Sequence, residues 1–485
     1  MNEYASPPLT PPMRRPWGVA AALLLASGLQ GCTVGPEFVR PAAPSFEHYT
    51  RQDPAALTDG DGGVTQALRR GQGVPVRWWQ AYGSPALDAL VAMALDGSAT
   101  LESARATVAQ ARHVLDAARG ARYPRIDLTA SAARTHGARD GVQGGAENVL
   151  SFGPALSADT DAFGANRRRV EQAQALADYQ LAQWQAAQLS LSGNTVLQAI
   201  ALAAAREQIA AVGDIIAVDR RNLELVRLAS EAGKSARLDV LTAESQLDSD
   251  RALLPPLQQQ ASVAAHALAV LAGKTAPWEP SPFALRDFSL PAELPLVLPS
   301  RLVQRRPDIL AARAQLHAAS AAIGIASAQL YPDITLSAQW TATGASVGGL
   351  FGGASLWNLA ANLVAPVFDA GTLAAQRAAA TDAYAAQLGA YRQALLQAFG
   401  QVADTLDSLR HDAALLEAQR KALGTALAVL DLTRQSYQAG QASLLQLLES
   451  QRQYQQARLG VARAQEQRYT DTAQWFIAMG GAPSP

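Results

Sequence analysis

The sequence is poor in cysteine, in aromatic residues and in net charge, and each shortage excludes a class of protein. Cys32 is the only cysteine, so neither an intramolecular disulfide nor a cysteine-rich metal site can form. A net charge of -1 gives no basic surface for nucleic acid. Aromatic residues make up 6% of the chain against 49% for all hydrophobic residues, of which Ala is a large part. This composition favours long, closely packed helices over the core of a globular enzyme.

Motifs for catalysis and cofactor binding are also missing. The six His residues are scattered, with no pair at metal-ligand spacing. No Gly-rich loop lies between a strand and a helix, where it would hold a phosphate. We therefore predict no catalytic residue, no cofactor and no metal site.

The chain contains an internal duplication. The octapeptide YPRIDLTA at 123–130 returns as YPDITLSA at 331–338, and the dipeptide Ala-Gly at 232–233 returns at 439–440. So long a repeat unit predicts two similar elements around one axis, because stacked solenoids have much shorter periods. We divide the chain into a signal peptide (1–31), a tether (32–77), a first repeat (78–277), a linker (278–300) and a second repeat (301–485) with a C-terminal equatorial segment.

The amino terminus resembles a bacterial lipoprotein signal. Arg14-Arg15 precede a short apolar stretch, 19–29, which leads into Gly31-Cys32. Cleavage before Cys32 would leave its thiol to be acylated, with Met1 or Met13 as the start. Thr33 differs from the Asp that retains lipoproteins in the inner membrane, which favours the outer membrane. The alternative is a buried cysteine behind an uncleaved anchor.

Two β-hairpins are predicted, at about 124–160 and 332–368, with roughly ten residues in each strand. Apolar and polar residues alternate strictly from Ile334 to Ala342, which gives each strand one apolar and one polar face. Gly-rich loops at 137–145 and 344–355 connect the strands. Such strands suit a transmembrane barrel, but four strands cannot close one, since the smallest have about eight. Either other chains complete the barrel or the strands form a soluble sandwich.

Two very long helices are predicted, at about 165–232 and 372–439, each about 100 Å long at about 1.5 Å per residue. Apolar residues of the second follow an unbroken 4-3 spacing, which is typical of a left-handed coiled coil. Gly233 and Gly440 end these helices, and return helices follow at 237–271 and 444–477. Pro255-Pro256 predicts a break in the first return helix, because proline removes a backbone hydrogen bond. The tether up to about 76 has no sustained periodicity and is expected to be extended.

Together these residues resemble the TolC-type outer-membrane factors, in the lipid-anchored branch that serves tripartite efflux pumps. The resemblance covers nearly all of the mature chain, and its motifs include Arg306-Pro307-Asp308-Ile309, Pro366 to Gly371, and Tyr437 to Gly440. It implies an α+β membrane protein in which three copies supply four transmembrane strands each to one 12-stranded barrel. Their coiled-coil helices would form a periplasmic tunnel.

The same resemblance implies the function and the partners. The protein would catalyse no reaction and would be the exit duct for small molecules such as drugs or toxic compounds. A periplasmic adaptor and an inner-membrane transporter would be its partners, and acylated Cys32 would hold it in outer-membrane lipid. A protein-secretion duct of type I and a coiled-coil lipoprotein scaffold without a pore are the alternatives. The sequence does not identify the substrate, because in such assemblies the inner-membrane pump selects it.

The resemblance also places a gate near the two helix turns. Asp239 and Tyr437 would hydrogen-bond across the coiled coils, through a charge-assisted bond that a small helix rotation breaks. Glu449 matches a constriction carboxylate, and three copies would form a negative ring that favours cations. Gln446 replaces the other constriction carboxylate. The alternatives are solvated helix faces for Asp239 and Glu449, and seam packing for Tyr437.

Overall fold

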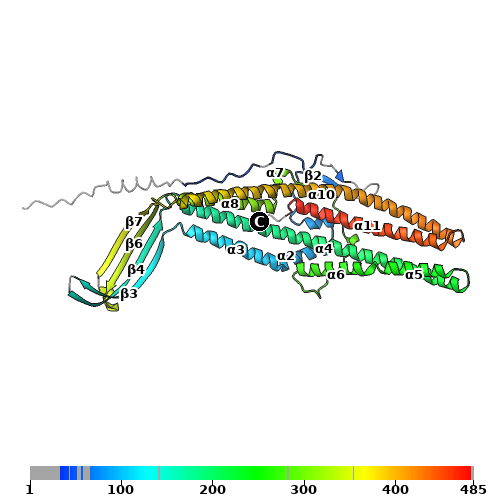
Figure 1. The fold of residues 1–485 in the computed structure, drawn as a ribbon, viewed down its shortest axis with the longest axis horizontal. Helices are drawn as coiled ribbons and strands as arrows, with labels where there is room; N and C mark the ends of the chain where they lie inside the picture. Colours follow the sequence, from blue (N-terminus) through cyan, green and yellow to red (C-terminus); the bar gives the residue numbers. More distant parts are fainter. Residues whose placement is uncertain are drawn as a thin grey trace, which may run out of the picture. The chain divides into compact units, whose positions relative to one another are not determined.

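The computed structural model describes residues 33–42, 44–51, 56–57, 66–139, 142–280, 283–352 and 354–481 (Figure 1). The predicted signal peptide and Cys32 lie outside them. The chain divides into two compact units, each with segments from both repeats. Among the described residues, unit 1 comprises 33–39, 111–139, 142–176, 315–352 and 354–387, and unit 2 comprises the rest.

A four-stranded antiparallel sheet dominates unit 1. Its strand order is β3-β4-β6-β7, so the two hairpins join through β4 and β6 (Figure 1). Both predicted hairpins are confirmed, although the strands of the first have 15 and 18 residues and exceed the predicted ten. The strand bounds are β3 (Arg125–Arg139), β4 (Val142–Asp159), β6 (Asp333–Gly344) and β7 (Ala354–Val364).

The connection between β6 and β7 is a correction to the sequence prediction. A Gly-rich loop at 344–355 was expected there, and a short helix that the sequence did not predict, α9 (Val347–Gly352), occupies its centre. Ser346 explains the start of this helix, because its Oγ accepts a hydrogen bond from the backbone N–H of Gly349 at 3.3 Å.

The long helices match their predicted bounds closely. α4 (Ala165–Glu231) and α10 (Thr372–Gln438) have 67 residues each, and α11 (Leu444–Ala478) follows α10. Two shorter helices precede the hairpins, α3 (Ala99–Gly120) and α8 (Pro307–Ala328). Among the described helices only α8 is long and apolar enough to cross a membrane, and half of its most apolar window is buried, as in a core helix.

The predicted break in the first return helix is confirmed. α5 (Arg237–Arg251) ends just before the two prolines, and α6 (Leu254–Leu271) begins with them in its first turn. Proline is tolerated there because the first N–H groups of a helix have no intrahelical partner.

The main hydrophobic core lies in unit 2. It gathers Trp78, Tyr82 and Trp475, which are fully buried, around the middle of α4 and α10. Two of these side chains are held by hydrogen bonds: Tyr82 Oη donates to the carbonyl of Tyr469 at 2.7 Å, and Trp475 Nε1 donates to that of Pro295 at 2.9 Å. The smaller elements here are η1 (Trp78–Tyr82), α2 (Pro85–Gly97), η2 (Leu285–Asp287) and α7 (Pro299–Leu302).

A small sheet in unit 2 gives part of the predicted tether a regular structure that was not expected. β2 (Gln66–Arg70) pairs in parallel with β5 (Glu293–Leu296), and β1 (Ala56–Leu57) pairs with β2 in antiparallel fashion. Leu68 of the tether and Leu294 of the linker are neighbours in this ladder, and both are buried. Regular structure therefore begins before Trp78, because the linker supplies a strand edge far away in sequence.

Candidate functional site

The sheet of unit 1 has one continuous apolar face, and its opposite face carries most of the polar residues. In a ladder, directly paired residues lie on the same face. Trp340 pairs with Trp357 and Ala338 with Leu359, while Gln339 pairs with Asn358 between them. The alternation stays in phase across the junction of the hairpins, where Leu156 pairs with Ala338. Further pairs on the apolar face include Ile126 with Leu156, Ala130 with Phe152, and Leu336 with Ala361.

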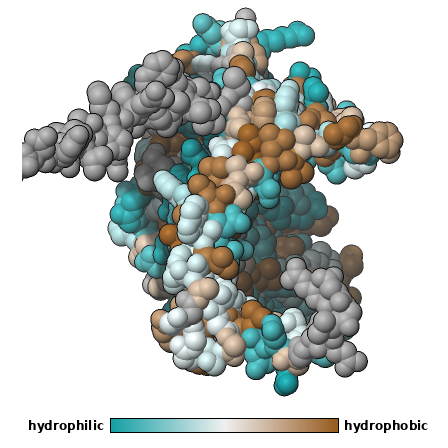
Figure 2. Space-filling view, turned by 90° about the vertical axis from the view of Figure 1, so that its left-hand side faces the viewer, coloured by the Kyte–Doolittle hydropathy of each residue, from teal (hydrophilic) through white to brown (hydrophobic). Residues whose placement is uncertain are grey.

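The apolar face is exposed in the single chain. Leu359 is 74% exposed and Trp357 is 79% exposed, although large apolar side chains are normally buried. In Figure 2 such hydrophobic residues, in brown, lie at the surface beside hydrophilic residues in teal. Among the described strands, β3 and β7 each have one neighbour, so both edges of the sheet are unpaired. A wide apolar face with two open edges indicates a sheet that is completed outside the chain.

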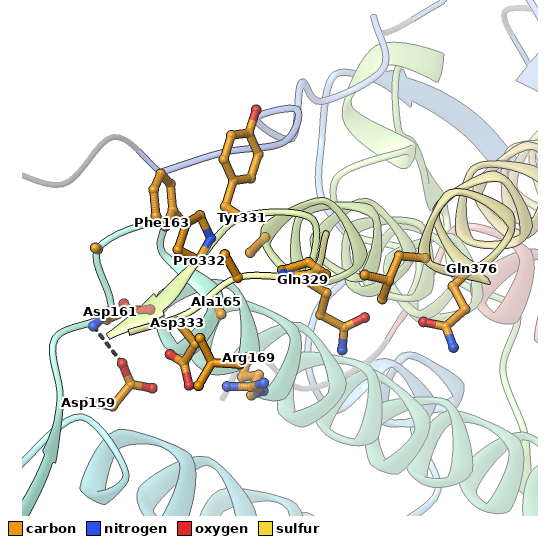
Figure 3. Close-up of a pocket in the computed structure, with 16 residues that line it drawn as sticks. Asp159, Asp161, Phe163, Ala165, Arg169, Gln329, Tyr331, Pro332, Asp333 and Gln376 are labelled. Carbon is orange, nitrogen blue, oxygen red and sulfur yellow. Dashed lines mark hydrogen bonds between the residues drawn. The ribbon is translucent and has the colours of Figure 1, made fainter. Parts of the chain in front are cut away.

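A cavity of about 490 Å³ lies where β4 ends and β6 begins (Figure 3). Phe163 and Tyr331 stack beside it with ring centroids 4.8 Å apart. Asp161 lines the cavity, but its carboxylate is already used: it accepts hydrogen bonds from the backbone N–H groups of Asn166 at 2.7 Å and Arg167 at 3.0 Å. The carboxylate therefore caps α4 and fixes how the chain passes from strand to helix.

Asp369 repeats this cap at the end of the second hairpin. Its oxygens accept from the backbone N–H of Gly371 at 2.9 Å and that of Leu373 at 2.7 Å, at the start of α10. These backbone hydrogen bonds hold the pKa of Asp369 below its usual range. Asp161 and Ala370 have positive φ angles of 49° and 54°, so both junctions contain a left-handed residue. The sequence analysis did not single out either cap.

The two helix turns at the other end of the long helices are built alike. Gly233 has φ 70° and Gly440 has φ 74°, values that favour glycine. The N–H of Lys234 reaches back to the carbonyl of Ala229 at 2.7 Å and closes the end of α4. These turns place the predicted gate residues on α5, α10 and α11.

Asp239 and Gln446 lie at the starts of the return helices. Asp239 Oδ2 accepts from Ser235 Oγ at 2.7 Å and from the N–H of Ala236 at 3.0 Å. Gln446 Oε1 accepts from the N–H of Ser443 at 2.8 Å. In the single chain, the hydrogen bonds of Asp239 thus lie in its own turn and do not include Tyr437.

Tyr437 lies in the last turn of α10 and is 38% exposed. Glu449 is exposed on α11 and forms an ion pair with Arg452, one turn further on, at 2.7 Å. The hydrogen bonds from Arg452 and Gln453 hold the pKa of Glu449 below its usual range, so it carries its charge at neutral pH. The ion pair offsets part of that charge, which the sequence analysis did not foresee.

Buried carboxyl groups in the coiled coils were missed. Asp219 of α4 is 2% exposed and Asp250 of α5 is 5% exposed. A sequence signal existed, because Asp219 occupies a seam position between Ile216 and Leu223, which are buried apolar residues. Among the described residues, no group of three or more His, Cys, Asp or Glu side chains is arranged to hold a metal ion.

The sequence and the fold both match known proteins. Residues 90–274 and 298–481 match the family model described as outer membrane efflux protein. The chain is 34% identical over 477 residues to the pyoverdine export outer membrane protein OpmQ of Pseudomonas aeruginosa, with 96% of each chain covered.

Two solved channels have the same fold. The outer-membrane channel OprN superposes with a TM-score of 0.84 at 27% identity, covering 93% of this chain and 99% of OprN. The open state of the MtrE outer membrane channel of Neisseria gonorrhoeae gives 0.81 at 26% identity, covering 93% of this chain and 98% of MtrE. The tunnel-and-barrel fold class predicted from the sequence is confirmed.

Proposed function

Because the chain belongs to the outer membrane efflux protein family, we propose that three copies of it form the exit duct of a tripartite efflux pump. The protein is an outer-membrane efflux channel. The duct would pass small molecules, such as drugs or toxic compounds, from an inner-membrane transporter and a periplasmic adaptor to the outside. In this role the chain moves its substrate without transforming it.

The observation that carries the proposal is the exposed sheet with two open edges. In lipid every backbone N–H and C=O must be paired within the protein, so a sheet survives only when it is closed into a barrel. Three copies would supply twelve strands, with β3 of one copy beside β7 of the next. The apolar face, including Trp357 and Leu359, would then face lipid, and the polar face, including Gln339 and Asn358, would line the lumen.

The gate is the second part of the proposal. In the single chain Asp239 caps α5, and Tyr437 is partly exposed on α10. We propose that the trimer brings the Tyr437 phenol of one helix pair to the Asp239 carboxylate of another and closes the tip. Glu449, which is exposed and charged, would form the negative ring below it.

Anchoring through Cys32 is the third part. The described chain starts at Thr33, whose side chain packs against Gly164, while Val34 donates its N–H to the carbonyl of Phe163 at 3.2 Å. The residues after Cys32 thus lie at the junction of β4 and α4. An acyl group on Cys32 would be held near the base of the sheet, where the inner leaflet of the outer membrane is expected.

Reconstitution tests the channel and its assembly together. Purified full-length protein in planar bilayers is expected to give trimers by native mass spectrometry and single-channel conductance. Monomers without conductance would contradict the proposal and favour the alternative of a coiled-coil scaffold without a pore. Deleting the gene in its host is expected to raise small-molecule susceptibility; loss of a secreted protein with unchanged susceptibility would instead identify a duct for type I protein secretion.

A further inference from the structure

Two carboxyl groups meet inside the coiled coil of the first repeat. Asp219 projects from α4 and Asp250 from α5, and the two lie close enough for the Asp250 carboxyl group to act on that of Asp219. Both are almost completely buried, at 2% and 5% exposure. A cluster of buried apolar residues joins α4 and α5 to α11 in this region. Its members are Val212, Ile216, Leu223, Ala243, Leu247 and Leu459.

The packing of this pair favours one shared proton. Neither carboxyl oxygen of Asp219 has a hydrogen-bond donor among the described residues. Asp250 Oδ2 accepts from Gln246 Nε2 at 2.8 Å, and Gln246 lies on the same helix. Two ionised carboxylates buried side by side would repel, and neither could donate to the other. A proton on one of the two removes this repulsion and supplies the missing donor.

We propose that Asp219 and Asp250 share one proton and act as a latch that fastens α5 to α4 and opens when the proton is lost. The proton is the ligand of this site. The latch goes beyond the proposed function as an exit duct, and its protonation does not depend on that function.

Among the described residues, no cation forms an ion pair with Asp219 or Asp250. Arg220 follows Asp219 on α4 and lies beside Leu247 and Asp248 of α5, but it is not among the groups that act on the pKa of Asp219. Facing α4 from α11, Arg458 is paired with Asp214 at 2.8 Å, and Gln451 accepts from Asn222 at 3.0 Å. On α5, Arg251 is paired with Asp248 at 3.0 Å. An ion pair between α4 and α5 joins Arg227 to Glu244.

The pH dependence follows from the burial of the pair. Burial, followed by the hydrogen bond to Asp250 and the charge of Asp250, raises the pKa of Asp219 from 3.8 to about 8. In the unfolded chain Asp219 loses its proton near pH 4. A raised folded-state pKa means that the folded protein binds the proton more tightly than the unfolded chain does. The latch is therefore strongest below about pH 4 and weakens as pH rises to about 8.

A second pair occurs in the other repeat. Asp471 of α11 is 1% exposed and lies close enough to Asp412 of α10 to be affected by it, and burial first of all raises the pKa of Asp471 to about 7. Gln467 Nε2 donates to Asp471 at 2.9 Å, Arg468 on the same helix opposes the rise, and Tyr82 faces the pair from η1. Both long helices are thus joined to their return helices through two aspartates, at positions that the duplication does not align.

The first latch lies on the order of 20 Å along α4 from the turn at Gly233. Losing its proton would leave two buried negative charges between α4 and α5, which favours separation of the helices or entry of water. We expect the helix pair to loosen at alkaline pH, close to the predicted gate.

Infrared spectroscopy on the full-length protein in detergent tests the latch directly. The wild type is expected to keep a protonated-carboxyl absorption at pH 6.5, where exposed aspartates are ionised, and to lose it as pH passes about 8. Asp219→Asn should remove the part of the absorption that persists to the highest pH in the wild type. Asp248→Asn, an exposed neighbour on α5, is the matched control and should leave it unchanged. No such absorption in the wild type, or the same absorption in folded Asp219→Asn, would overturn the proposal.

Thermal unfolding tests the link between the proton and the packing. The melting temperature of the wild type should fall by several degrees between pH 5 and pH 8, and Asp219→Asn should flatten this slope because its amide donates at every pH. If Asp219→Asn does not fold, Asp250→Asn takes its place, and the wild-type spectrum remains decisive. If the melting temperature depends on pH equally in the wild type and in the variant, the latch is refuted. If the latch is confirmed but the protein gives no conductance in planar bilayers, only the exit-duct proposal is refuted.

Discussion

Asp239 and Gln446 occupy the same structural position in the two halves of the chain. Each lies in the first turn of a return helix, and each accepts a hydrogen bond from the N–H that precedes it by three residues, at 3.0 Å in Asp239 and 2.8 Å in Gln446. The two halves have thus kept the cap but differ in its charge, because the capping group is a carboxylate on α5 and a neutral amide on α11. Substituting Asp239 would damage a helix start as well as a gate, so Tyr437 offers the cleaner test.

Tyr437→Phe is expected to raise the conductance of the closed channel. The phenol has no capping role, and a hydrogen bond to a charged group contributes about 1.5–3 kcal/mol, which corresponds to at least a tenfold shift in the closed-to-open ratio per bond. Single-channel recordings measure the shift. Tyr454→Phe on α11 is the control. A mutant pore as closed as the wild type would show that Tyr437 and Asp239 do not hold the tip.

Glu449→Gln is expected to reduce the preference for cations, measured as the reversal potential in a salt gradient. The effect should be moderate, because Arg452 already offsets part of the charge. Hydrogen bonds from Arg452 lower the pKa of Glu449, so wild-type selectivity should persist below pH 4.5 and decline in stronger acid. Glu417→Gln, on α10 and paired with Lys421, is the control. Unchanged selectivity in Glu449→Gln would remove this residue from the constriction.

Leu359→Arg and Asn358→Arg place the same charge on opposite faces of β7. An Arg on a lipid-facing position at mid-membrane costs about 2–4 kcal/mol, whereas a lumen-facing Arg keeps its water. We expect Leu359→Arg to lower the yield of heat-resistant trimer in outer-membrane fractions, and Asn358→Arg to assemble normally. The opposite result would mean that the polar face lies toward lipid.

Asp161→Ala should destabilise the protein by about 1 kcal/mol, because it removes the side-chain cap of α4. Asp116→Ala, an exposed aspartate of α3 with a surface ion pair, should cost much less. Denaturant unfolding compares the two. Equal losses would mean that backbone geometry alone holds the junction.

Cys32→Ser should abolish incorporation of a labelled fatty acid such as palmitate and leave an unprocessed signal peptide, visible by mass spectrometry of the intact chain. Serine offers no thiol for acylation. Processing and labelling that persist in the variant would contradict the lipoprotein assignment.

Most of the fold was predictable because its strands and helices follow from apolar residues that recur at short intervals along the sequence. The alternation around Trp340 and the 4-3 spacing that ends at Tyr437 are local patterns, so strands and coiled-coil helices followed from them. The helix break at Pro255-Pro256 was equally local. The sheet between β2 and β5 was not predictable, because Leu68 and Leu294 are neighbours only in space.

By itself the sequence determined the two hairpins, the long helices with their turns, the duplication and the family, because these depend on residue spacing along the chain. Only the tertiary structure decided that β4 pairs with β6, so that one apolar face runs through both hairpins. It also decided that Asp219 meets Asp250. The physical reason is the same in both cases: strand register and the pKa of a carboxyl group depend on neighbours that folding brings together from distant parts of the chain.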